Sequence, residues 1–138
     1  MMVHQEDDFG CGVACVANRL QISYGQALRL FDNPAAARDK GYACKYIVRA
    51  LRNAGVEAKL KHISVHKKRP TFEPDDIVFL AKSERYPFQH YLIRTDQGWI
   101  DPWINMHTDK NVINARAGIR KILPGRPYYY ITSRKALE

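Results

Sequence analysis

The spacing of apolar residues changes near Gly55 from a helical period to a strand period, and this change constrains the fold most. Before Gly55, apolar residues recur every three to four positions, which predicts helices. After it, residues 56–62 alternate apolar or histidine side chains with charged ones, the pattern of a half-buried strand. A chain that places its helices first and its strands afterwards folds as an α+β domain. We therefore expect N-terminal helices packed on a mostly antiparallel sheet.

Capping and turn residues set the boundaries of these elements. Ser23 and Gln26 have the spacing of a capping box, which starts a second helix that Asn33 and Pro34 end. Helices are predicted over residues 11–21, 24–31 and 42–53, with a late helix over residues 112–123. Strands are predicted over residues 56–62, 76–81, 88–94, 98–101 and 127–132.

The length and composition of the chain indicate one compact domain over residues 1–138. The 138 residues are 46% hydrophobic and 11% aromatic, which is enough for a core of its own. The apolar runs are too short to span a membrane. The N-terminus carries Glu6, Asp7 and Asp8 where a secretion signal needs apolar residues. We therefore expect a cytoplasmic domain without a membrane span.

The cysteines indicate reduced thiols and no metal centre. Three is a low and odd count, which argues against a disulfide scaffold. Cys11 and Cys15 lie four residues apart, but His4 and Cys44 do not complete a recognisable zinc spacing with them. Residues 10–12 lack the third glycine of a dinucleotide fingerprint. No metal and no cofactor is predicted, and Cys15 is expected to be a small buried side chain.

The charge balance raises the question of anionic partners. Lys and Arg number 22 against 14 Asp and Glu, a formal net charge of +8. Such a balance favours partners such as an acidic protein, a nucleic acid or an anionic surface. The densest basic run, residues 66–69, contains no interleaved aromatic residue, so nucleic-acid binding is not expected there. An acidic protein partner stays open, and a solvated loop is the default structure for this run.

Cys11 is the residue for which the sequence indicates chemical reactivity most clearly. It directly precedes an apolar helical pattern, so its thiol is expected at a helix N-terminus. Unpaired backbone N–H groups and the positive end of the helix dipole favour the thiolate there. Gln5 lies six residues upstream, from where its amide N–H can reach the sulfur. The sequence therefore predicts a nucleophilic cysteine rather than a purely structural one.

His90 and Asp101 are the candidate partners of that thiol. They lie in two predicted strands joined by a turn centred near Asp96. In this hairpin the two side chains become direct or diagonal neighbours on one face, roughly 5–8 Å apart. A register slip of one residue would place them on opposite faces.

These residues resemble, in type and order, the papain-like peptidase domain found at the N-terminus of bacteriocin-processing ABC transporters and in its stand-alone relatives. The shared features are Gln5, the run Cys11-Gly12 entering a helix, His90 at the start of an apolar strand, and Asp101 followed by Pro. The resemblance covers residues 3–102. One departure is Gly10, where that family usually has an acidic residue. The resemblance implies a papain-like cysteine peptidase fold and a peptide or protein substrate.

The resemblance also implies a role for each site residue. Cys11 is expected to be the nucleophile, paired as a thiolate with protonated His90. His90 then protonates the leaving amine and activates water against the thioester. Asp101 orients the imidazole, and the amide of Gln5 joins the backbone N–H of Cys11 in binding the oxyanion.

Two other functions remain open from the sequence. A thioester at Cys11 that is resolved by an amine, or formed from a glutamine side chain, gives a transamidase or a deamidase with the same triad. A non-catalytic module that uses its basic surface to bind an acidic protein or nucleic acid is the third possibility. The presence of all four site residues favours an enzyme.

Overall fold

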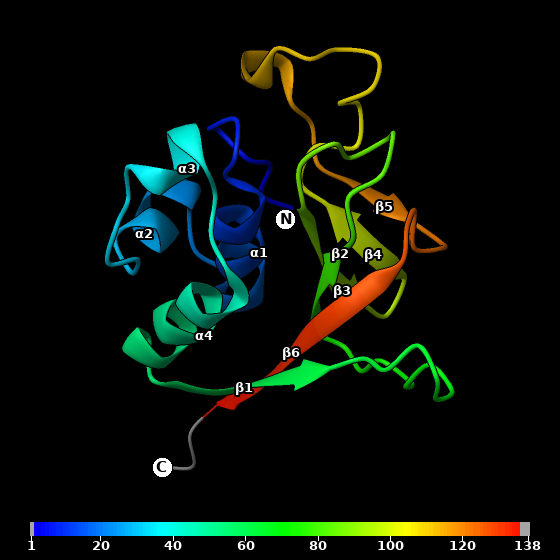
Figure 1. Ribbon diagram of the computed structural model, residues 1–138. Helices are drawn as coiled ribbons and strands as arrows, with labels where there is room; N and C mark the ends of the chain where they lie inside the picture. Colours follow the sequence, from blue (N-terminus) through cyan, green and yellow to red (C-terminus); the bar gives the residue numbers. More distant parts are fainter. Residues whose placement is uncertain (1, 136–138) are drawn as a thin grey trace.

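The computed structural model describes residues 2–135 and places the helices together on one side of a six-stranded antiparallel sheet (Figure 1). The helices are α1 (Cys11–Leu20), α2 (Tyr24–Leu28), α3 (Ala36–Asp39) and α4 (Cys44–Asn53). The strands are β1 (Val56–His62), β2 (Ile77–Leu80), β3 (His90–Thr95), β4 (Gly98–Asp101), β5 (Gly118–Arg120) and β6 (Pro127–Lys135). The α+β prediction is confirmed.

Three of the four helices lie where they were predicted, whereas α3 lies in a stretch for which no helix was predicted. α1 is buried along most of its length and ends at Leu20, and its C-cap residue Gln21 adopts a left-handed conformation with φ 56°. The capping box of α2 is present, since Ser23 accepts from the N–H of Gln26 and the side chain of Gln26 accepts from the N–H of Ser23. α2 ends at Leu28, three residues before its predicted end.

The sheet has the order β1-β6-β2-β3-β4-β5, with every neighbouring pair antiparallel. The bounds of β1 and β4 are as predicted, and β2 and β3 differ by one or two residues. β6 runs three residues further than predicted and crosses the sheet between β1 and β2 (Figure 1).

The predicted helix over residues 112–123 is wrong. The segment instead forms a short 3₁₀ turn, Val112–Asn114, and then β5, which pairs with β4. Its apolar residues do not form a buried stripe, because Ile113 and Ile122 are 83% and 80% exposed. Pairing with β4 supplies backbone hydrogen bonds that outweigh a weak helical pattern in this segment.

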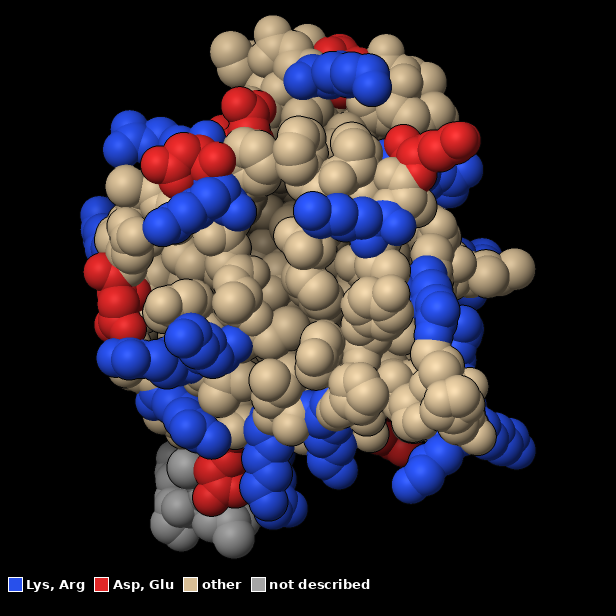
Figure 2. Space-filling view, in the orientation of Figure 1, with Lys and Arg blue, Asp and Glu red and all other residues tan. Residues whose placement is uncertain are grey.

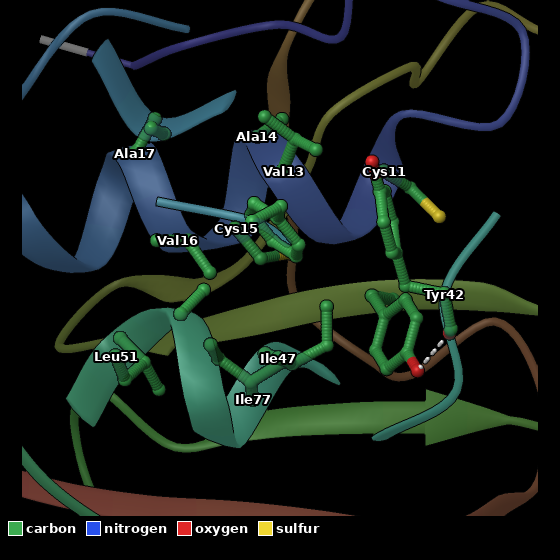
Figure 3. Close-up of a cluster of buried hydrophobic side chains, with 14 of the residues drawn as sticks. Cys11, Val13, Ala14, Cys15, Val16, Ala17, Tyr42, Ile47, Leu51 and Ile77 are labelled. Atoms are coloured by element: carbon green, nitrogen blue, oxygen red, sulfur yellow. Dashed lines mark hydrogen bonds between the residues drawn. The ribbon is translucent and has the colours of Figure 1, made fainter. Parts of the chain in front are cut away.

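Side chains are buried on both faces of the sheet. The larger cluster packs α1 and α4 against strand residues such as Ile77 and Ile93 (Figure 3). A second cluster contains Val78, Leu92 and Trp99, which alternate along their strands with members of the first. The strands that carry His90 and Asp101 therefore run through the interior, where their polar groups need partners. None of the helices within residues 2–135 has the length and hydropathy of a membrane span.

Candidate active site

Cys11 is the first residue of α1, as its position in the sequence predicted. It follows the N-cap Gly10, and within the described chain no side chain caps this helix end. The first N–H groups of the helix therefore lack side-chain acceptors and favour an anion. Only 7% of Cys11 is exposed, and Figure 3 shows its sulfur pointing away from the labelled core residues that follow it in α1. The thiol faces a cleft.

His90 and Asp101 lie in adjacent strands, β3 and β4, as predicted. Ile93 pairs with Ile100, a register that makes the two side chains diagonal neighbours on one face. The Nε2 atom of His90 lies 2.7 Å from Oδ1 of Asp101. Both residues are buried, Asp101 completely.

Cys11 and His90 line one cleft, with a volume of about 410 Å³, between the helical side and the sheet side. Burial alone would lower the pKa of His90. The charge and hydrogen bond of Asp101, followed by the hydrogen bond and charge of Cys11, raise this pKa to about 9. These interactions favour the protonated form of His90, whose ring lines the same cleft as Cys11.

The same cleft is aromatic and has basic residues at its edges. Figure 2 shows the molecule hollowed between its two sides, with Lys and Arg side chains on both sides of the hollow. Lys40 and Lys82 belong to the lining. Aromatic side chains from both sides of the cleft make up much of the wall: Phe9, Tyr42, Tyr46, Phe79, Tyr86, Phe88 and Tyr91.

The carboxylate of Asp101 has four hydrogen-bond donors. Besides His90, Oδ1 accepts from the backbone N–H of Trp103 at 3.0 Å. Oδ2 accepts from the hydroxyl of Tyr86 at 2.8 Å and from Nε of Arg120 at 2.7 Å. Burial would raise the pKa of Asp101, but His90, Arg120 and the N–H of Trp103 hold it well below its usual range. Asp101 is thus a permanent carboxylate.

Tyr86 and Arg120 were not predicted as site residues. Tyr86 lies in the loop between β2 and β3, and its ring stacks on that of His90 with centroids 4.2 Å apart and planes at 8°. Arg120 lies in β5, the strand that the sequence pattern assigned to a helix. The register that pairs Trp99 with Arg120 and Asp101 with Gly118 is what brings Arg120 to Asp101. No local motif carries that information.

Gln5 lines the cleft but its amide is already engaged. Its Nε2 donates to the backbone carbonyls of Asp7 at 3.0 Å and Asp8 at 3.2 Å. Its backbone N–H donates to the carbonyl of Pro102, which ties the segment before α1 to the chain just after Asp101. Among the described residues, Oε1 of Gln5 is the only buried side-chain N or O atom without a hydrogen-bond partner. Gln5 is therefore at the site, with both donors of its amide turned to the loop.

The other cysteines and histidines lie outside this arrangement. Burial raises the pKa of Cys15 well above its usual value, and burial likewise raises the pKa of Cys44. Both thiols therefore stay protonated near neutral pH. The remaining histidines, His4, His62, His66 and His107, do not line the cleft. Residues 2–135 contain no group of three His, Cys, Asp or Glu side chains arranged to hold a metal ion.

Comparisons with known proteins bear on the fold. No protein-family model and no curated protein matches the sequence. Among solved structures, the chain is similar to the peptidase domain of Streptococcus ComA, a bi-functional ABC transporter involved in a quorum-sensing pathway. The similarity has a TM-score of 0.57 at 18% sequence identity and covers 97% of each chain. The resemblance predicted from the sequence is thus confirmed for the fold, and the chain has the papain-like α+β fold of that peptidase domain.

Proposed function

We propose that this protein is a cysteine peptidase that cleaves a peptide or protein through a thioester at Cys11. The observation that carries the proposal is the arrangement of three side chains. Cys11 begins α1 at the cleft, His90 faces the same cleft, and Asp101 binds the ring of His90 at 2.7 Å. A thiol, a base beside it and a third group that orients the base are the parts that nucleophilic catalysis needs.

In the first step, the Cys11 thiolate attacks the carbonyl carbon of the scissile bond. As the tetrahedral intermediate collapses, the carbon–nitrogen bond breaks and His90 donates its proton to the leaving amine. In the second step, neutral His90 takes a proton from water, which attacks the thioester; the carbon–sulfur bond breaks, and the acid is released with Cys11 again a thiolate and His90 again protonated. Asp101 holds the ring through Nε2, so that its other nitrogen is directed to the sulfur.

The oxyanion would be bound at the start of α1. The backbone N–H of Cys11 belongs to the first helical turn, which has no side-chain cap. Gln5 is the proposed second donor, and it has to exchange one of its hydrogen bonds to Asp7 or Asp8 for the oxyanion. Removing one such donor typically lowers the rate by about 10²–10³-fold.

The substrate is proposed to be a peptide segment. The likeness to a peptidase domain supports this class, and an open cleft lined on both sides by aromatic residues suits an extended chain. Water as the acceptor gives a peptidase when a peptide bond is cleaved and a deamidase when a glutamine side chain is attacked, whereas an amine acceptor gives a transamidase with the same residues. Product analysis by mass separates these three outcomes.

The test is intact-protein mass spectrometry after treatment with a thiol-directed peptide electrophile. We expect one adduct on the wild type and on Cys15→Ala, and none on Cys11→Ala. His90→Ala should react at least about tenfold more slowly at neutral pH, because the imidazolium that stabilises the thiolate is gone. Comparable labelling of all three cysteines would contradict the proposal.

A further inference from the structure

The counter-ion of Asp101 is the feature of the molecule that the proposed catalytic triad leaves unexplained. Arg120 donates from Nε to Oδ2 of Asp101 at 2.7 Å, and its side chain is only 17% exposed. A second Arg120 nitrogen donates to the carbonyl of Ile104 at 3.3 Å, which fixes the guanidinium at two points. A partly buried, twice-anchored arginine on a buried catalytic carboxylate is a costly arrangement unless it compensates another charge.

The charges in the site balance only when Arg120 is counted. In the ion-pair form, Cys11 and Asp101 are negative and His90 is positive, which would leave one buried negative charge uncompensated. Arg120 is permanently protonated and supplies the missing positive charge. Cys15 and Tyr86, the other titratable groups near Asp101, are neutral, because burial and the negative charges nearby raise both of their pKa values. With Arg120 compensating Asp101, the positive charge of His90 compensates the negative charge of the Cys11 thiolate.

We propose that Arg120 and Tyr86 are positioning residues of this site. Arg120 is the counter-ion of Asp101, and together the two side chains hold Oδ2 so that Oδ1 stays on the ring of His90. The inference rests on the proposed function and extends it to a strand outside the sequence resemblance. Neither side chain is assigned a step in bond making or breaking.

Tyr86 restrains both members of the His90–Asp101 pair at once. Its ring lies parallel to the imidazole at 4.2 Å, and its hydroxyl donates to Oδ2 at 2.8 Å. Tyr86 is 1% exposed, so the stack also separates the pair from water. Rotation of the imidazole away from Asp101 would have to displace this ring, and the surrounding cluster packs against it.

The test compares two substitutions of Arg120 that differ in charge. Arg120→Gln removes the positive charge, so the pKa of His90, followed by NMR of its ring protons, should rise by about one unit. The pH midpoint at which Cys11 becomes alkylated by iodoacetamide should rise with it. Arg120→Lys keeps the positive charge but replaces the planar guanidinium, so the pKa of His90 should remain unchanged. Because the lysine cannot hold Asp101 in the same geometry, kcat should fall about tenfold with KM unchanged.

Two further variants complete the design. Arg116→Gln removes the same charge from an exposed side chain that does not contact Asp101, and neither the pKa of His90 nor kcat should change. Tyr86→Phe keeps the stacked ring and removes one hydrogen bond to Oδ2, so kcat should fall about fivefold. Circular dichroism and thermal melting verify that each variant is folded.

Two results would overturn the inference. One is a folded Arg120→Gln variant whose His90 titrates as in the wild type. The other, decisive where Arg120→Gln does not fold, is an Arg120→Lys variant with unchanged kcat. The titration of His90 needs no substrate, so it distinguishes this failure from a failure of the proposed peptidase activity, which the labelling of wild-type Cys11 reports.

Discussion

Gly10 shows how one residue without a side chain shapes the loop that precedes Cys11. A Cβ atom at Gly10 would overlap the hydroxyl of Tyr24, which donates to Oδ2 of Asp7 at 2.7 Å. This hydrogen bond fixes the loop between Gln5 and α1, whose carbonyls hold the amide of Gln5. The departure from the acidic residue expected before Cys11 is therefore explained by the packing of Tyr24.

We predict that Gly10→Ala lowers the free energy of unfolding by about 1–3 kcal/mol, since Tyr24 has to move and give up its bond to Asp7. The control is Gly25→Ala in α2, where a Cβ meets no atom within 4 Å. A helix interior favours Ala over Gly by roughly 0.5–1 kcal/mol, so this variant should gain stability. Urea unfolding measures both, and equal effects at the two glycines would refute the packing argument.

The sequence predicted the spatial arrangement of the candidate residues where local pattern and family likeness agreed, and their catalytic roles stay a prediction. Cys11 at a helix start and the hairpin that pairs His90 with Asp101 are local features, and the structure brings these three residues together as expected. Tyr86 and Arg120 were missed because their roles depend on a loop conformation and on a strand pairing. The orientation of the Gln5 amide was likewise set by Asp7 and Asp8 rather than by its distance from Cys11 along the chain.

Among the elements, β5 is the one whose placement matters most for the site. It carries Arg120 and pairs with β4, the strand of Asp101. Close approach of the two strands depends on Gly98, which has φ 138° and where a Cβ would lie 2.5 Å from the carbonyl oxygen of Arg120. A side chain at this position is excluded both by the backbone conformation and by the neighbouring strand.

We predict that Gly98→Ala displaces β5 and lowers kcat in the same direction as loss of the Arg120 contact. Gly55→Ala is the matched control, because Gly55 also has a positive φ, 83°, but no atom lies within 4 Å of its Cβ position. Backbone strain of about 1–3 kcal/mol should destabilise both variants. Only Gly98→Ala should lose activity, measured as kcat on a peptide substrate under conditions where both are folded. Equal activity in the two variants would show that β5 does not position the site.

The misassigned helix over residues 112–123 shows the limit of periodicity. Apolar residues at helical spacing occur there, yet Ile113 and Ile122 are exposed and the chain extends to complete the sheet edge. The β1–β4 assignments succeeded because alternation, a continuous apolar run of strand length and a hairpin turn are local signals. The pairing of β5 with β4 joins segments separated by a long loop, and its hydrogen bonds are not encoded in the pattern of either segment alone.

Over the whole molecule, the positive charge is distributed rather than concentrated at the site. The formal net charge is +8, and Figure 2 shows Lys and Arg side chains around much of the visible face. Within the site, Asp101 is paired with His90 and Arg120. The exposed basic run at residues 66–69 lies outside the cleft, and two of its members, Lys67 and Arg69, line a separate hollow together with Arg126. The two surfaces can therefore be tested independently.

Two sets of variants test whether the cleft that contains Cys11 or the basic run at residues 66–69 carries the function of the protein. Replacing Lys67, Lys68 and Arg69 together by Gln should leave kcat/KM for an uncharged peptide within about twofold of the wild type. The reason is that none of these exposed side chains lines the cleft, and solvent and salt weaken the effect of exposed charges. Cys11→Ala should abolish turnover of the same peptide while leaving the melting temperature nearly unchanged, because Ala is well tolerated at a helix start.

If the basic run were the functional surface, binding of an acidic partner would weaken steeply with salt and with the triple replacement, and Cys11→Ala would have no effect. Turnover and partner binding measured on both variants at two salt concentrations separate the two functions, because each variant removes one of them and leaves the other intact.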